Sequence, residues 1–130
     1  MSFQSSSELH AAFYKKAIEI GSLSKLVSNY LKADLAVLKP NGRENVNIYF
    51  SGDIIRQSDS LAPEIIKAQQ EPFSEQKHKH AETLKWLTSR LFLNFRRLEK
   101  CDSDGREFVS ILNRELRKFK KLQKNWMLTI

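Results

Sequence analysis

Apolar residues recur at steps of three and four along most of this chain, which is the spacing of one face of an α-helix. The first run of this kind comprises Leu9, Phe13, Ala17, Ile20, Leu23, Val27 and Tyr30. Ser7 has a side chain that is favoured at a helix N-cap, so we expect the first helix to begin there. The helix should end after Leu31, with one or two further turns within residues 33–38.

A second helical pattern begins within residues 45–47, after the turn Lys39-Pro40-Asn41-Gly42, and runs to about Gln70. Its expected inward face comprises Ile48, Gly52, Ile55, Ser58 or Asp59, Ala62, and Ile65 or Ile66. Pro63 lies inside the pattern. Because a proline ring clashes with the carbonyl four residues back, we expect a kink within residues 59–62.

Two further helices follow. We expect the third to begin with Ser74 as its N-cap, and its inward face comprises Leu84, Leu87, Leu91, Phe95 and Leu98, flanked by Phe92. A turn cluster at residues 101–105 ends it. The fourth helix should run from about Gly105 to Met127. Its inward face comprises Phe108, Ile111 or Leu112, Leu116, Phe119, Leu122 and Trp126.

Four amphipathic helices joined by short turns bury their apolar faces most simply against one another. The 130 residues include only 4 Gly and 3 Pro, too few for a turn-rich all-β chain, and this length suggests one domain. We therefore predict an all-α fold, an antiparallel up-and-down four-helix bundle, as a single domain over residues 1–130.

The cellular location is indicated by three negative observations. Cys101 is the one cysteine, so the chain can form no internal disulfide and suits a reducing cytoplasm. Residues 1–7 lack the basic and apolar runs of a signal peptide, and no apolar run is long enough to span a membrane. We expect a cytoplasmic protein without membrane association.

Positive charge is concentrated in the second half of the chain. Residues 77–124 contain 14 Lys and Arg but only 6 Asp and Glu, a local net charge of +8. The remaining residues together carry −1 of the chain's total of +7. Such asymmetry is typical of proteins that bind a polyanion or an acidic protein surface, although a soluble charged helical face has the same composition.

The outward cations of the third and fourth helices merge into one field if those helices are antiparallel neighbours. The candidate binding residues are Arg90, Arg96, Arg97, Arg114, Arg117, Lys118, Lys121 and Lys124, with Lys120 at their border. Phosphates suit such a field because each neutralised charge releases a counterion. No base-reading motif is present, so we expect RNA or DNA binding with weak sequence selectivity. Alternatively, Glu82, Glu99 and Glu115 pair with these cations and leave an ordinary solvated face.

Trp86 and Leu93 are large apolar residues outside the core stripe of the third helix. They are seven residues apart and therefore lie on one face. An exposed strip of this kind is typical of a contact with another copy or a partner helix, and we predict an oligomer contact there. A core face wide enough to include both residues is the alternative.

The residues that could support catalysis do not form a recognisable site. His78 and His80 are two apart, so on a helix they point about 200° apart and cannot easily share a metal. Asp102 and Asp104 lack the spacing of a calcium loop and indicate a turn, and Cys101 has no sign of activation. We expect no catalytic, cofactor-binding or metal-binding residue, and a protein that is not an enzyme.

The second helix carries a family resemblance. The run of residues 52–68 resembles the signature of the 23S rRNA intervening-sequence proteins. The matching positions are Ile54, Arg56, Ser60, Leu61 and Ile65. The proline is displaced by one position, and Ala68 stands where the signature has glycine. The helix order and the total length also agree, so the resemblance covers most of the chain.

The same superfamily of four-helix bundles includes the accessory variability proteins of diversity-generating retroelements. Those proteins are small and very basic, form pentameric barrels, and bind a reverse transcriptase and nucleic acid. This chain is similar to them in its charge and in its basic fourth helix, which ends at residues 122–126. The resemblance implies a homo-oligomer, with a pentamer as the family's form, whose partners are nucleic acid and a reverse transcriptase. The competing hypothesis is a structural or regulatory bundle that binds only other proteins.

Overall fold

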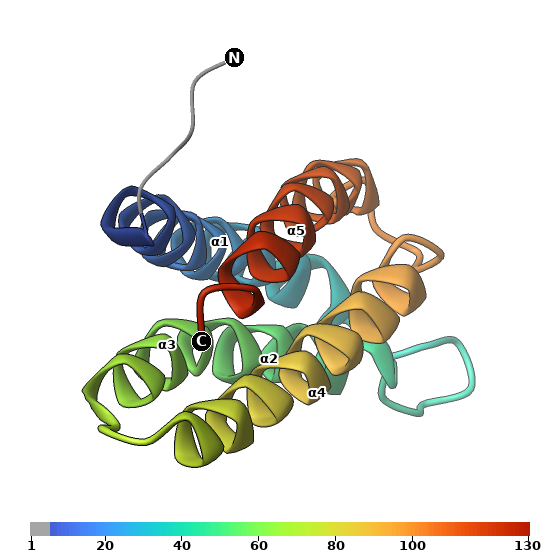
Figure 1. Cartoon of the computed structure of the whole chain (residues 1–130). Coiled ribbons are helices and arrows are strands. Elements are labelled where there is room, and N and C mark those ends of the chain that lie inside the picture. Colours follow the sequence, from blue (N-terminus) through green and yellow to red (C-terminus); the bar gives the residue numbers. More distant parts are fainter. Residues whose placement is uncertain (1–5) are drawn as a thin grey trace.

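The computed structural model describes residues 6–130 and contains the helices α1 (Ser6–Leu35), α2 (Asn47–Asp59), α3 (Leu61–Gln70), α4 (Ser74–Leu98) and α5 (Arg106–Met127). Only Ser60 separates α2 from α3, so the two make one interrupted rod (Figure 1). Pro63 has no backbone N–H to donate, which accounts for the interruption, and this break at Ser60 lies within residues 59–62, where the kink was predicted. The all-α prediction is also confirmed, since α1, the α2/α3 rod, α4 and α5 form a four-helix bundle.

Neighbouring helices run antiparallel. α1 packs against the α2/α3 rod and α5, and α4 packs against the same two partners. Along α1, the aromatic contacts with α5 go from Phe119 opposite Phe13 to Phe108 opposite Tyr30. Because the numbers rise in one helix as they fall in the other, the two helices point in opposite directions. The bundle is therefore up-and-down, as predicted.

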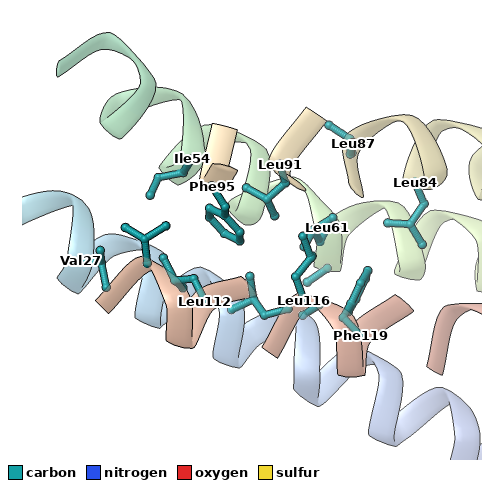
Figure 2. Packing of buried hydrophobic residues seen from close by; sticks show 14 of the residues in the cluster. Val27, Ile54, Leu61, Leu84, Leu87, Leu91, Phe95, Leu112, Leu116 and Phe119 are labelled. Carbon is teal, nitrogen blue, oxygen red and sulfur yellow. The ribbon is translucent and has the colours of Figure 1, made fainter. Parts of the chain in front are cut away.

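The apolar faces of the helices meet in one core, which Figure 2 shows from close by. Every residue predicted for the inward face of α4 is buried, and so are Phe119 and Trp126 of α5. The ring of Phe13 lies 4.6 Å from that of Phe119 and 5.0 Å from that of Trp126, so these three residues form an aromatic cluster. No helix within residues 6–130 combines the length and the apolar content needed to cross a membrane.

Most residues predicted for the inward faces of the first and fourth helices are buried or half-buried, but Tyr30 and Phe108 are not, and of the alternatives Ile111 and Leu112 it is Leu112 that is buried. Tyr30, Phe108 and Ile111 are 48%, 46% and 41% exposed, and the buried residues beside them are Leu31, Val109 and Leu112. Where the end of α1 meets the start of α5, the buried position lies one residue further along, and the outer aromatic and aliphatic side chains are left at the edge between the two helices. A 100° step per residue is enough to make this difference.

In α2, the inward positions predicted at Gly52 and Ile55 lie one residue earlier, at Ser51 and Ile54, whereas Ser58 is buried as one of the two predicted alternatives. Ser51 escaped the prediction because a serine counts as polar in a hydrophobic pattern. Here the Ser58 hydroxyl donates to the carbonyl of Ile54 at 2.6 Å, and the Ser51 hydroxyl donates to the carbonyl one turn before it. A serine that is satisfied within its own helix packs like a small apolar residue.

The predicted N-caps are wrong as well. α1 begins at Ser6, so Ser7 lies inside the helix. Phe73 occupies the cap position of α4 with an extended backbone, and Ser74 is the first helical residue. The Ser74 hydroxyl lies 3.2 Å from Nδ1 of His78 instead. Helix boundaries are the least certain part of a sequence pattern, because a serine suits the cap and the first turn alike.

The α4–α5 connection packs closely on the end of α1. The Ser103 hydroxyl donates to Asp34 of α1 at 2.6 Å and accepts from the backbone N–H of Gly105 at 3.0 Å. A Cβ atom at Gly105 would lie 2.6 Å from Cδ1 of Tyr30 and 2.9 Å from Cδ2 of Leu31. Both distances are far inside van der Waals contact, so only glycine fits where α5 begins.

We expect Gly105→Ala to lower the free energy of unfolding by about 1–3 kcal/mol, since the added methyl group overpacks this corner. Gly52→Ala is the matched control. The nearest atom to its new Cβ is a guanidinium nitrogen of Arg56 at 3.8 Å, so the change should stabilise the helix by about 0.5–1 kcal/mol. Urea denaturation of both variants measures the difference, and equal stabilities would contradict this packing.

Candidate nucleic-acid interface

The antiparallel contact between α4 and α5 brings cations from the two helices together. Near one end, the Asn113 side chain of α5 donates to the carboxylate of Glu99, which directly follows α4. In the middle, Lys120 of α5 lies over the ring of Phe92 of α4. Towards the other end, Lys85 of α4 lines one cavity together with Lys120 and Lys124 of α5. The third and fourth predicted helices are therefore neighbours, as the merged field requires.

Phe92 lies at the centre of the surface where the cations of α4 and α5 meet. Nζ of Lys120 lies 4.5 Å from the centroid of its ring, and the guanidinium carbon of Arg96 lies 5.8 Å from the same centroid. Cations are attracted to the face of an aromatic ring, at about 0.5–1 kcal/mol each where the site is exposed. The ring therefore holds one cation from each helix at the α4–α5 groove.

Helical spacing extends this arrangement in both directions. Arg117, Lys120 and Lys124 stand at positions i, i+3 and i+7 of α5, and Lys85 and Arg96 stand seven residues before and four after Phe92. All of these cations are exposed. We call this set the α4/α5 basic groove, and its members are Lys85, Arg96, Arg117, Lys120 and Lys124. Within residues 6–130, none of the five forms a salt bridge with a carboxylate.

The structure divides the predicted cation set, and the expectation of a single field is corrected here. Arg90 and Arg97 lie on the opposite side of α4, where they line a hollow of about 280 Å³ against α2. The guanidinium of Arg90 lies 5.2 Å from the Trp86 ring centroid, and that of Arg97 lies 4.7 Å from the centroid of Phe50. Arg90 and Arg97 are seven residues apart and share a face, whereas Arg96 is turned by 100° from Arg97.

The remaining predicted cations belong to α5. Arg114 and Lys121 are exposed and flank Arg117 at three- and four-residue steps, so they border the groove on its outer side. Lys118 lies on the side that faces α1, where its Nζ contacts the Glu115 carboxylate at 3.1 Å. This pairing neutralises Lys118 in part. Of the acids predicted to compete for the cations, Glu115 is thus engaged, while Glu82 and Glu99 form no salt bridge within the described chain.

Glu115 also joins α5 to α1 through Lys16. The Lys16 ammonium contacts Glu115 at 2.8 Å and Glu19 at 2.7 Å, and both Lys16 and Glu115 side chains are less than one-fifth exposed. The hydrogen bond from Lys16 lowers the pKa of Glu115 below its ordinary range, and the same bond raises the pKa of Lys16. Both groups are therefore charged near pH 7, and this face of α5 has a structural role.

Trp86 and Leu93 are 57% and 46% exposed, so the alternative of a wide core face that includes them is wrong. Both line the same α2/α4 hollow as Arg90 and Arg97.

A second apolar surface was not predicted. It is a groove of about 280 Å³ between α1 and α5, lined by Leu23, Leu26, Val27, Tyr30, Phe108, Ile111 and Leu112. Its outer residues were assigned to the core, which is why the sequence pattern concealed it.

The histidines and the cysteine are engaged in local contacts. His80 lies between two carboxylates, at 3.0 Å from Glu64 and 3.3 Å from Glu71. His78 points its Nδ1 at the backbone carbonyl of Ser74. Cys101 is 1% exposed. In the part of the chain that the structure describes, no cluster of His, Cys, Asp or Glu is suited to hold a metal ion.

Sequence reasoning missed two residues of the groove and one beneath it. Lys85 was counted only in the net charge, and Lys120 only as a border residue. Gln123 was not considered, although it interrupts the apolar stripe between Phe119 and Trp126, which is the signal that could have found it.

Comparison of the chain with protein-family models, curated proteins and solved structures finds no match.

Proposed function

We propose that this chain is a non-catalytic nucleic-acid-binding protein that holds RNA or DNA along the α4/α5 basic groove. The observation that supports this function is the convergence of five cations from two helices, none of which has a carboxylate partner within residues 6–130. Unpaired cations on one face raise the local potential and attract a phosphate backbone. Lys and Arg that contact phosphates fix position without reading bases, so sequence selectivity is weak.

The wider role that the family resemblance implies belongs to the same proposal. In that role the protein is a cytoplasmic homo-oligomer, pentameric in form, and an acidic surface of a reverse transcriptase is a further partner for the groove. The buried single thiol of Cys101 suits a reducing compartment.

A salt titration of the wild-type protein tests nucleic-acid binding. We expect the logarithm of the association constant for a mixed-sequence duplex to fall linearly with the logarithm of salt concentration. Each phosphate contact contributes a slope of about −0.9, so a groove that engages three to five phosphates gives roughly −3 to −5. Fluorescence anisotropy with a labelled duplex measures it. No binding at about 50 mM salt, or a slope near zero, would contradict the proposal that the protein binds RNA or DNA through phosphate contacts.

The homo-oligomer contact at Trp86 and Leu93 stays a prediction, and light scattering tests it. We expect Trp86→Asp with Leu93→Asp to reduce the mass in solution to that of one chain, because two carboxylates cannot be buried between copies without partners. The control is Leu26→Asp with Ile111→Asp in the α1/α5 groove. An oligomer that survives the first pair of changes and dissociates with the second has its contact at α1 and α5.

A specific observation favours a second candidate function, that of a helical bundle that binds only proteins. The α1/α5 groove exposes contiguous apolar residues, with Leu26 at 69%, and monomeric proteins rarely leave such a surface uncovered. The occupant in this case is the matching groove of a second copy. An oligomer that assembles through α1 and α5 and binds no RNA or DNA at low salt would establish this function in place of the first.

A further inference from the structure

A cavity of about 530 Å³ lies between α4 and α5 at one end of the basic groove. Its lining residues are Lys85, Thr88, Ser89, Lys120, Gln123, Lys124, Met127 and Leu128. Ligand sites for small molecules occupy roughly 300–1,000 Å³, so this cavity has the size of an organic ligand and far exceeds that of an inorganic ion. The lining includes polar donors and apolar side chains, and therefore suits a ligand with both kinds of surface.

The charge of the cavity is entirely positive. Lys85 comes from α4, while Lys120 and Lys124 come from α5, so the ammonium groups converge from two helices. No Asp or Glu is among the lining residues, and within residues 6–130 none of the three lysines has a salt-bridge partner. Unpaired lysines in a recess suit a phosphate group, which accepts hydrogen bonds from several donors at once.

Gln123 is the second, independent observation. Its side chain lines the cavity but is only 5% exposed, and its amide nitrogen is enclosed and has no hydrogen-bond partner within residues 6–130. A buried donor that is left unpaired is destabilising, so a glutamine here weakens the fold unless something else accepts its hydrogen bond. The nearby Thr88 hydroxyl donates to the carbonyl of Leu84 at 2.7 Å, and within residues 6–130 it does not accept from the Gln123 amide.

The remaining wall is apolar. Met127 and Leu128 follow Lys124 at the end of α5, and the Leu128 side chain is 84% exposed. A flat heteroaromatic base can lie against such side chains, and its ring nitrogens and carbonyl oxygens are acceptors for a glutamine amide. The cavity thus places a base surface and a phosphate site next to one another, with the Gln123 side chain in the wall between them.

We infer that this cavity takes one unpaired nucleotide of a bound strand, with its phosphate on Lys85, Lys120 and Lys124 and its base between Gln123 and the Met127–Leu128 wall. The inference rests on the proposed function, because the strand reaches the cavity along the α4/α5 basic groove. A base within a duplex is stacked and paired, so only a single-stranded end, loop or bulge can supply this nucleotide.

Three labelled ligands test the inference by anisotropy. They are a blunt duplex, the same duplex with a three-nucleotide overhang, and that duplex with an overhang of three abasic residues, which keeps the phosphates and removes the bases. We expect the normal overhang to bind about tenfold more tightly than the abasic one. Equal affinity of the two overhangs would overturn the inference and leave the proposed function intact, whereas absence of binding to all three would overturn both.

Variants identify the cavity as the source of the preference. We expect Gln123→Leu to abolish the tenfold difference between the overhangs, to leave affinity for the blunt duplex within about twofold, and to raise the melting temperature, because an unpaired amide is replaced by an apolar group of similar size. Lys124→Met should weaken binding to the overhangs more than Lys121→Met, which removes the same charge outside the cavity lining. A preference that survives both Gln123→Leu and Lys124→Met would place the nucleotide elsewhere and overturn the inference.

A free nucleotide has the same base and phosphate as a nucleotide within a strand. A fourth ligand, a nucleoside monophosphate, distinguishes the two. We expect nucleoside monophosphates to bind at least a hundredfold more weakly than the overhang duplex, because they lack the rest of the strand. Micromolar binding of a monophosphate, without binding of any duplex, would assign the cavity to a free nucleotide and overturn the strand-bound inference.

Discussion

A protein with Arg96→Glu, Lys120→Glu and Lys124→Glu binds RNA or DNA at least about a hundredfold more weakly than the wild type at low salt. The three changes remove the cations that converge at Phe92 and at the α4–α5 cavity and replace them with charges that repel phosphate. The slope of the salt titration should fall towards zero at the same time. All three side chains are exposed, so helicity measured by circular dichroism should not change.

Lys15→Glu, Lys25→Glu and Lys39→Glu form the matched control. These lysines are exposed on α1 and in the loop after it, so the control has the same net charge as the groove variant but leaves the groove untouched. We expect its affinity to lie within about threefold of the wild type. If the two triple variants lose affinity equally, binding depends on net charge alone and the α4/α5 basic groove is not the site.

Phe119→Ala has the largest expected effect on stability. Phe119 is fully buried and stacks on Phe13 at 4.6 Å, within the aromatic cluster that joins α1 to the end of α5. Truncation of a buried phenylalanine leaves a cavity and costs about 3–5 kcal/mol, a large part of the stability of a domain of this size. Urea denaturation should therefore show a clear fall in the midpoint with little change in the slope.

Phe108→Ala is the control for that prediction. Phe108 has the same side chain on the same helix but is 46% exposed at the α1/α5 groove, where it contacts Tyr30 edge-on. We expect a loss of about 1 kcal/mol or less, because little apolar surface leaves the core. Similar losses for the two variants would show that the sequence-based face, which places both residues inside, describes the protein better than the structure does.

The sequence pattern predicted the helices and their order because a three- and four-residue repeat is a property of single helices. It placed the core of α4 for the same reason, and Pro63 indicated the interruption at Ser60. It failed where burial depends on a neighbour. Tyr30 and Phe108 are at the edge because of how α1 and α5 meet, and Ser51 is inside because its hydroxyl bonds to its own helix.

The candidate site was predicted in part. Arg96, Arg117 and Lys124 lie where the merged field requires them, since α4 and α5 are neighbours. Arg90 and Arg97 do not, because the rotation of α4 about its axis turns them towards α2, and no single-helix pattern contains that rotation. The pairing of Lys118 with Glu115, and the unpaired amide of Gln123, likewise depend on positions that only the folded chain defines.

The amide chemical shifts of the protein, followed by NMR during titration with a short single-stranded oligonucleotide, test the central claim most directly. Shift changes should concentrate within residues 85–96 of α4 and residues 117–128, which comprise the second half of α5 and Leu128 after it. The middle of α1 should be unaffected. Changes that concentrate on the α1/α5 groove or on the α2/α4 hollow, or no changes at all at low salt, would contradict the assignment of the α4/α5 basic groove as the surface that holds nucleic acid.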